Sequence, residues 1–272
     1  MNPRDFDIRS DKFINNLLAE DFCAQVIPES EYIVVTGSLV QGWGNDASDI
    51  DLIAVISSDS VPDFRYQVKN RAGITVISGK YMDTPVDLEV IPSSYLADIK
   101  ASISHAKAAD LSAALSISDD MKTSLNNLRL GIPLYGDRRF YHFRESFPWS
   151  GLAKLLMIQS DNYARSLLYD TIGAVDSMNG PTAYLCSLEL VGAAVETSLH
   201  AVGDTSIKGK WRLKRLLQKN MTHVADLYID SWLQEKNDDK DLIERAEERI
   251  LSAQEVLQIS QELLHAGEAD QK

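Results

Sequence analysis

Two kinds of hydrophobic pattern divide the chain. Up to about residue 140, short runs rich in Val and Ile are separated by turn residues, which is typical of β-strands. The pattern predicts a helix at 12–24, followed by strands at 32–36 and 50–56 and a hairpin of 74–78 with 86–91. This part of the chain should therefore form a mixed sheet flanked by helices.

From Pro148 onward, apolar residues recur at the spacing of an amphipathic helix. Gly180-Pro181 and Gly203-Asp204 are typical of helix ends and starts. The predicted helices cover 150–175, 181–202, 210–219, 222–236 and 239–265. The expected fold class is α+β, with a mixed-sheet domain at 1–140 and a C-terminal α-helical bundle at 141–272.

Composition narrows the class of protein. The 272 residues are 44% hydrophobic and 25% charged, which is typical of a soluble globular protein. No apolar run approaches the roughly 18–20 residues that span a bilayer, and the N-terminus lacks the apolar stretch of a signal peptide. We therefore expect a cytoplasmic protein with no membrane partner.

Charge and cysteine content exclude further classes. The net charge of −13 makes nucleic acid an unlikely partner, because such binding needs many Lys and Arg on phosphates. Cys23 and Cys186 are far apart and form no CxxC motif, so neither a zinc cage nor a disulfide framework is expected. A homodimer remains possible.

Two aspartates carry the candidate chemistry of the sheet domain. Asp49 and Asp51 stand two residues apart at the start of the strand predicted at 50–56, so their side chains should point to one face. Carboxylates that close repel each other unless a cation lies between them. Mg²⁺ binds through one or two carboxylates plus substrate phosphates. Solvated aspartates at the mouth of a strand are the alternative.

Gly37-Ser38 directly follows the strand predicted at 32–36. A glycine there lets backbone N–H groups and a hydroxyl approach phosphate oxygens. With Ser48-Asp49-Ile50-Asp51-Leu52 a short gap later, the pair resembles the signature of the nucleotidyltransferase superfamily. This superfamily includes DNA polymerase β, the aminoglycoside nucleotidyltransferases and the minimal nucleotidyltransferases. The resemblance covers residues 31–92 and implies a nucleotidyltransferase core.

The resemblance also implies a third carboxylate on a later strand. The strand predicted at 86–91 offers Asp87 and Glu89 on one face. Asp87 fits the polymerase β pattern, in which the aspartate precedes a proline, here Pro92. Glu89 fits antibiotic-modifying relatives that place a glutamate in this strand. Asp87 is the preferred metal ligand, and Glu89 is kept as an alternative ligand or a general base.

The resemblance implies an activity and a role for each residue. Asp49, Asp51 and Asp87 would hold two Mg²⁺ ions, and Gly37 with Ser38 would bind the phosphates of ATP or another NTP. The enzyme would transfer a nucleoside monophosphate to a hydroxyl of a small molecule, such as an aminoglycoside-like antibiotic, and release pyrophosphate. A transferase that modifies a protein or tRNA, and a non-catalytic nucleotide-binding protein of the same fold, are the alternatives.

The helical half resembles the C-terminal bundles of kanamycin-type nucleotidyltransferases, where helices form one wall of the substrate cleft. It contains a basic cluster in an acidic chain: Lys208, Lys210, Arg212, Lys214, Arg215 and Lys219. Lys210 and Arg212 are candidates to bind the triphosphate, and a solvated helix face is the alternative. Glu189 and Glu196 would attract a cationic acceptor if they face the cleft, and otherwise are simply exposed.

Overall fold

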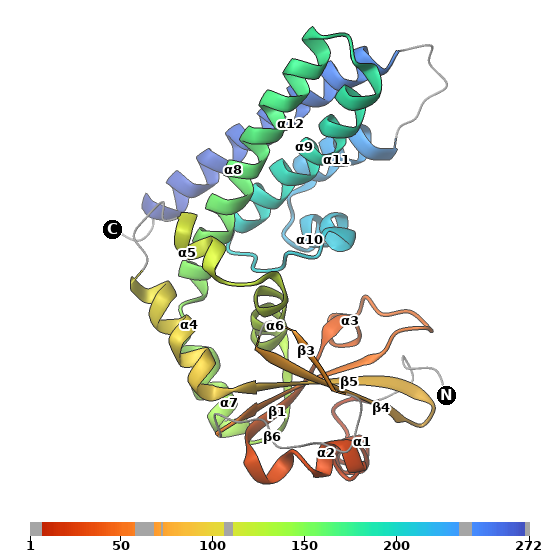
Figure 1. The fold of residues 1–272 in the computed structure, drawn as a ribbon, viewed down its shortest axis with the longest axis vertical. Coiled ribbons are helices and arrows are strands. Elements are labelled where there is room, and N and C mark those ends of the chain that lie inside the picture. Colours follow the sequence, from red (N-terminus) through yellow and green to blue (C-terminus); the bar gives the residue numbers. More distant parts are fainter. Residues whose placement is uncertain (1–6, 58–67, 72, 106–110, 234–240, 270–272) are drawn as a thin grey trace. The chain divides into compact units, whose positions relative to one another are not determined.

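The computed structural model describes residues 7–57, 68–71, 73–105, 111–233 and 241–269. The chain divides into two compact units, one of Met1–His105 with Ile117–Pro148 and the other of Ala106–Ser116 with Trp149–Lys272. The first holds a sheet with helices and the second is helical (Figure 1). The expected α+β class is confirmed. The division differs from the predicted one, because the chain enters the helical unit, returns to the sheet unit and leaves it again at Pro148.

The sheet has six strands in the order β3-β4-β5-β2-β1-β6. They are β1 (Ser30–Thr36), β2 (Ile50–Ile56), β3 (Val68–Arg71), β4 (Ile74–Tyr81), β5 (Thr84–Pro92) and β6 (Ile132–Tyr135). β2 and β5 pair in parallel, and the other neighbours pair antiparallel. The sheet is mixed, as predicted. β3, with the sequence Val-Lys-Asn-Arg, carries no apolar run and was not predicted.

The predicted hairpin is present as β4 and β5, joined by a two-residue turn. Met82 and Asp83 form this turn with φ angles of 48° and 70°. Two consecutive positive φ values match the type I′ turn, whose twist suits a right-handed β-ribbon. The hairpin places β5, which carries Asp87 and Glu89, beside β2, which carries Asp51.

One face of the sheet is covered by α1 (Asp11–Leu18) and α2 (Asp21–Ala24), seen below the strands in Figure 1. Leu17, Phe22 and Cys23 pack there against alternate residues of the strands in one apolar core. The single helix predicted at 12–24 is in fact two helices, because Glu20 has an extended backbone between them. The break allows both helices to turn apolar side chains toward the sheet.

The other face carries α4 (Ser93–His105), α6 (Asp119–Leu130) and α7 (Asp137–Ser146). Thr36 Oγ1 donates a hydrogen bond of 2.7 Å to the carbonyl of Asn127, which fixes α6 at the end of β1. The Tyr32 ring packs 5.6 Å from Phe140 and 5.8 Å from Phe143, which fixes α7 at the start of β1. Helices therefore cover both ends of this face.

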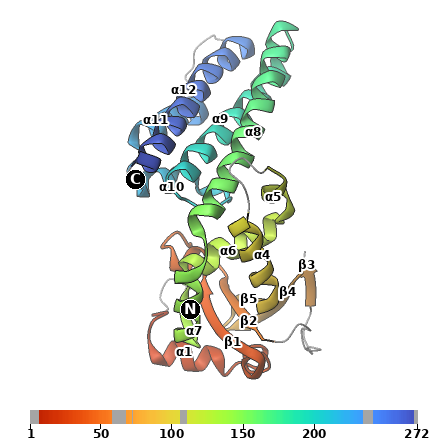
Figure 2. The same cartoon turned by 90° about the vertical axis from the view of Figure 1, so that its left-hand side faces the viewer.

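The helical unit is built on three long helices, α8 (Trp149–Asp176), α9 (Gly180–Ala201) and α12 (Leu242–Ala269). They lie side by side in Figure 2. The shorter elements are α5 (Leu111–Ser116), the 3-10 helix η3 (Gly209–Trp211), α10 (Arg212–Gln218) and α11 (Thr222–Leu233). α9 is largely apolar and forms the centre of the core. Within the described residues, no helix combines the length and apolar character needed to cross a bilayer.

Candidate functional site

A row of polar residues crosses four neighbouring strands of the sheet. Thr36 of β1 pairs with Asp51 of β2, and Asp51 pairs with Asp87 of β5. Asp87 in turn pairs with Ser78 of β4. Paired residues point to the same face, and adjacent strands lie about 4.8 Å apart. The register therefore brings Asp51 and Asp87, predicted from segments far apart in sequence, onto neighbouring positions of one face.

Gly37, directly after β1, lies against Asp51. Its φ is +77°, and a Cβ built on it would lie 1.7 Å from Asp51 Oδ2. A side chain cannot occupy that position, so the Asp51 carboxylate lies over bare backbone. The glycine of the predicted motif is thus required by both conformation and space.

The segment after Gly37 is a tight turn that returns the chain to β2. Ser38 lies in α3 (Gly37–Val40), and its carbonyl accepts hydrogen bonds from the N–H groups of Trp43 and Gly44, at 2.8 and 2.9 Å. Asn45 N–H donates to Ser48 Oγ at 2.8 Å just before Asp49. These bonds hold Ser38 and Asp49 at the two ends of one connection, next to the row of polar residues.

Asp87 and Glu89 have different partners. Ser78 Oγ donates to Asp87 Oδ1 at 2.8 Å within the sheet. Ser124 Oγ, from α6, donates to Glu89 Oε2 at 2.5 Å. Glu89 pairs with Ile53 rather than with Asp51, so it lies one step further along the strands. The sequence pattern gave no sign of Ser78 or Ser124, because neither stands in a motif.

The donor set fits a hard divalent cation. Within the residues that the structure describes, no three His, Cys, Asp or Glu side chains gather as a metal site. Asp51 and Asp87 instead form a pair of carboxylates, with Asp49 two residues before Asp51. A pair is what Mg²⁺ uses when substrate phosphates supply other oxygens.

A solved structure has a similar arrangement of elements. It is a nucleotidyltransferase-like protein from Exiguobacterium sibiricum, with a TM-score of 0.51 and 14% identity over 90% of this chain and 74% of that chain. The chain has a nucleotidyltransferase-like fold. At this identity the similarity shows the fold alone. No family model matches the sequence, and no curated protein matches it.

The sheet residues of the predicted site belong to one unit, whereas Lys210 and Arg212 belong to the helical unit. Arg212 Nε donates to Glu196 Oε1 at 2.9 Å, and Arg212 also packs against the backbone of Gly192. Lys210 Nζ lies 5.2 Å from the centre of the Trp211 ring. Arg212 thus has a structural role that the basic pattern did not indicate.

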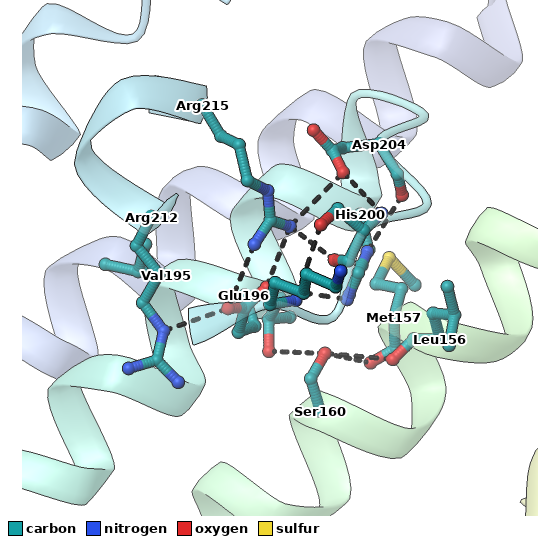
Figure 3. Close-up of polar contacts among 12 residues, drawn as sticks. Leu156, Met157, Ser160, Val195, Glu196, His200, Asp204, Arg212 and Arg215 are labelled. Carbon is teal, nitrogen blue, oxygen red and sulfur yellow. Dashed lines mark hydrogen bonds and ion pairs between the residues drawn. The ribbon is translucent and has the colours of Figure 1, made fainter. Parts of the chain in front are cut away.

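Glu196 is 8% exposed and belongs to a buried ionic network, drawn in Figure 3. Arg215, 1% exposed, lies 2.8 Å from Glu196 and 3.2 Å from Asp204 through Nη2. Glu196 is therefore not simply exposed, and its carboxylate is paired with arginines rather than presented to a cleft. Two guanidinium groups compensate the charge of this buried carboxylate, which offsets part of the cost of removing it from water. Glu189, by contrast, is exposed.

His200 completes this network. Its Nδ1 is 2.8 Å from the Asp204 carbonyl, and its Nε2 is 3.8 Å from Glu196 Oε2. Burial lowers the pKa of His200, against the opposing effect of Glu196. The imidazole is therefore held neutral inside a cluster of charged groups.

Proposed function

We propose that this protein transfers a nucleoside monophosphate from an NTP, with ATP as the leading candidate, to a hydroxyl group. The observation that supports this best is the pairing of Asp51 with Asp87, with the Asp51 carboxylate over the bare backbone of Gly37. Two carboxylates beside a glycine turn suit a metal-bound phosphate chain.

In the proposed reaction one phosphorus–oxygen bond forms and another breaks. The acceptor hydroxyl oxygen forms a bond to the α-phosphorus, and the bond from that phosphorus to the β-bridging oxygen breaks. Pyrophosphate leaves with the electron pair, and the hydroxyl proton passes to a base. Glu89 is the proposed base, with Ser124 holding its orientation.

Asp49, Asp51 and Asp87 are the residues that would hold two Mg²⁺ ions. When bound, such ions neutralise phosphate charge and lower the pKa of the attacking hydroxyl. Ser38 and the Gly37 amide would contact the outer phosphates. Ser78 would keep Asp87 in place, because its hydroxyl already donates to one carboxylate oxygen.

The proposed acceptor is a small hydroxylated molecule. The resemblance implies an aminoglycoside-like acceptor, which Glu189 and Glu196 would attract if they faced the cleft, but the charge of Glu196 is compensated by arginines. We therefore propose the class of hydroxylated small molecule without requiring a positive charge on it.

The test uses purified protein, α-³²P-labelled NTPs, Mg²⁺ and a panel of hydroxylated small molecules, with transfer of the label to the acceptor and release of unlabelled pyrophosphate as the readouts. Asp51→Asn and Asp87→Asn should each lower the rate at least about 100-fold, because several kcal/mol of charge stabilisation are lost. Asp83→Asn, in the exposed β4–β5 turn, is the matched control and should retain full activity.

The outcomes of this assay distinguish a small-molecule transferase from a macromolecular transferase and from a nucleotide-binding protein. Activity unchanged in both Asn variants, with normal melting curves, contradicts the carboxylate site. Label that enters protein or tRNA in a cell extract, with none on small molecules, replaces the proposed acceptor by a macromolecule. No transfer at all, with NTP still bound, indicates a binding protein.

A further inference from the structure

The sheet unit contains a cavity on the same face as the carboxylates, at the other end of the strands. Its volume is about 630 Å³, and β1, β2, α4 and α7 contribute to its walls. Tyr32 and Val55, which pair across β1 and β2, lie at its base. Each is four residues from Thr36 or Asp51, a distance of about 13 Å along a strand. The buried pair Val34 and Ile53 lies between the two places.

The base of the cavity is apolar with one unused hydroxyl. Leu96, Phe143 and Val55 supply apolar surface. Tyr32 is 2% exposed, and its hydroxyl has no hydrogen-bond partner among the described residues. Burial raises the pKa of Tyr32, so the hydroxyl keeps its proton. A buried hydroxyl without a partner is unfavourable, and a ligand oxygen that accepts from it would remove this cost.

The cavity is lined by basic side chains. Lys100 comes from α4, and Arg138, Arg139 and His142 come from α7. Lys100 Nζ donates to Ser146 Oγ at 3.0 Å, which links the two helices. The acidic residue that lines the cavity is Glu31.

The charged residues that line the cavity are mainly basic, although the chain as a whole is acidic. The whole sequence has 40 acidic residues and 27 Lys and Arg. Within the described part of the chain, neither arginine nor Lys100 lies within ion-pair distance of a carboxylate. Unpaired cations over an apolar base attract an anionic ligand and are free to bind it.

We propose that this cavity binds a phosphomonoester with a ring-sized organic body. The phosphate would lie between Lys100 and the two arginines, because a guanidinium binds phosphate oxygens in a bidentate manner. The organic body would lie on Leu96 and Phe143 and would accept a hydrogen bond from Tyr32. The volume is in the range of about 300–1,000 Å³ that is usual for small-molecule sites. The proposal does not depend on the transferase activity.

The test is calorimetric titration of the full chain with phenyl phosphate, AMP, benzoate and inorganic phosphate. EDTA is present throughout, so that no divalent cation binds at the Asp51–Asp87 pair. We expect both phosphomonoesters to bind one per chain and to raise the melting temperature. Affinity should fall as salt rises, because exposed charges are screened.

Single substitutions show whether the phosphomonoester binds in this cavity. Arg139→Gln and Lys100→Gln should each weaken binding by about tenfold, since each removes a charged contact to phosphate. Lys12→Gln, an exposed lysine of α1 on the other face of the sheet, is the matched control and should bind normally. Asp51→Asn should also bind normally, which separates this site from the candidate reaction centre.

Tyr32→Phe tests the base of the cavity. It should weaken phosphomonoester binding and leave the melting temperature of the free protein unchanged or higher, because the hydroxyl has no partner to lose. A lower melting temperature shows that the hydroxyl is structurally engaged and overturns its proposed role. Absence of binding by both phosphomonoesters overturns the site. Equal affinity for inorganic phosphate overturns the role of the organic body, and binding of benzoate alone overturns the choice of phosphate.

Discussion

Gly37 leaves no room for a side chain, and this can be measured. Ala at this position faces both an unfavourable positive φ and a contact of 1.7 Å with Asp51 Oδ2. We expect Gly37→Ala to lower the free energy of unfolding by about 2–5 kcal/mol, as the sum of backbone strain and overpacking. Urea denaturation gives the value, and any NTP-dependent activity should be lost with it.

Gly42 provides a control for the backbone contribution. Its φ is +69°, and a Cβ there would meet no atom within 4 Å. Gly42→Ala should therefore cost only the backbone strain, about 1–2 kcal/mol. Equal losses in the two variants would show that the contact between Gly37 and Asp51 is unimportant.

His200 gives a second prediction at the scale of a single residue. Its pKa is lowered in the folded protein, so below about pH 6.5 the unfolded chain takes up a proton that the folded chain does not. Stability should therefore fall as pH decreases from about 6.5 toward the lowered pKa. The contribution is up to about 1.4 kcal/mol for each pH unit.

The comparison is between wild type and His200→Asn, whose amide can replace Nδ1 toward the Asp204 carbonyl. Glu196, Asp204 and Arg215 remain in both proteins, so the difference in slope against pH reports the imidazole. A variant with the same slope as wild type would show that His200 is not held neutral.

At the scale of elements, the β4–β5 turn is not optimised. Met82 and Asp83 both have positive φ and are exposed, so neither contributes packing that compensates the strain. Replacing them with Asn-Gly, the preferred type I′ pair, should raise stability by about 1 kcal/mol. Thermal unfolding measures the gain, with Met82→Ala as a control that should give none. A loss of stability would indicate a contact at this turn that strain relief does not offset.

The elements predicted from sequence are those with strong periodic patterns. The strands at 32–36 and 50–56 and the long helices of the second half are present, because buried runs and apolar stripes depend on local sequence. α6 was not predicted. Its buried face includes Lys122, Asn126 and Asn127 alongside apolar residues, so tertiary packing decides its burial and the hydrophobic pattern does not.

In the candidate site too, local sequence patterns predict some residues, and tertiary structure alone brings in the others. Asp49, Asp51, Asp87 and Gly37 stand in motifs, and their alignment on strands follows from alternation. Ser78 and Ser124 reach the carboxylates through strand register and through helix placement, which no local pattern specifies. The basic cluster likewise gave no sign that Arg212 and Arg215 form ion pairs with the buried Glu196 of the same unit.

At the scale of the whole molecule, each unit carries one cysteine as a reporter. Cys23 lies in the sheet core, and burial raises its pKa to about 12, with a further contribution from Glu20. Cys186 lies on α9 and is partly exposed. Under native conditions a thiol reagent should modify Cys23 at least about 100-fold more slowly than Cys186, because the thiolate is the reactive form.

Single-cysteine variants, Cys23→Ser and Cys186→Ser, make the two rates separable. Along a urea gradient, reactivity of Cys23 should report opening of the sheet unit, and that of Cys186 should report the helical unit. Equal native rates at the two positions would contradict the burial of Cys23.

The chain passes between the two units three times, because Ala106–Ser116 belongs with Trp149–Lys272 rather than with the residues on either side. A fragment that stops at His105 therefore lacks β6, α6 and α7. It would lose the edge strand of the sheet, the hydrogen bond from Thr36 and the serine that holds Glu89. A single backbone cut between His105 and Ile117 would leave the sheet unit as two pieces joined by β1–β6 pairing and side-chain packing. We expect the two halves, expressed together, to associate through this pairing and to restore the arrangement of Thr36 and Glu89 with α6.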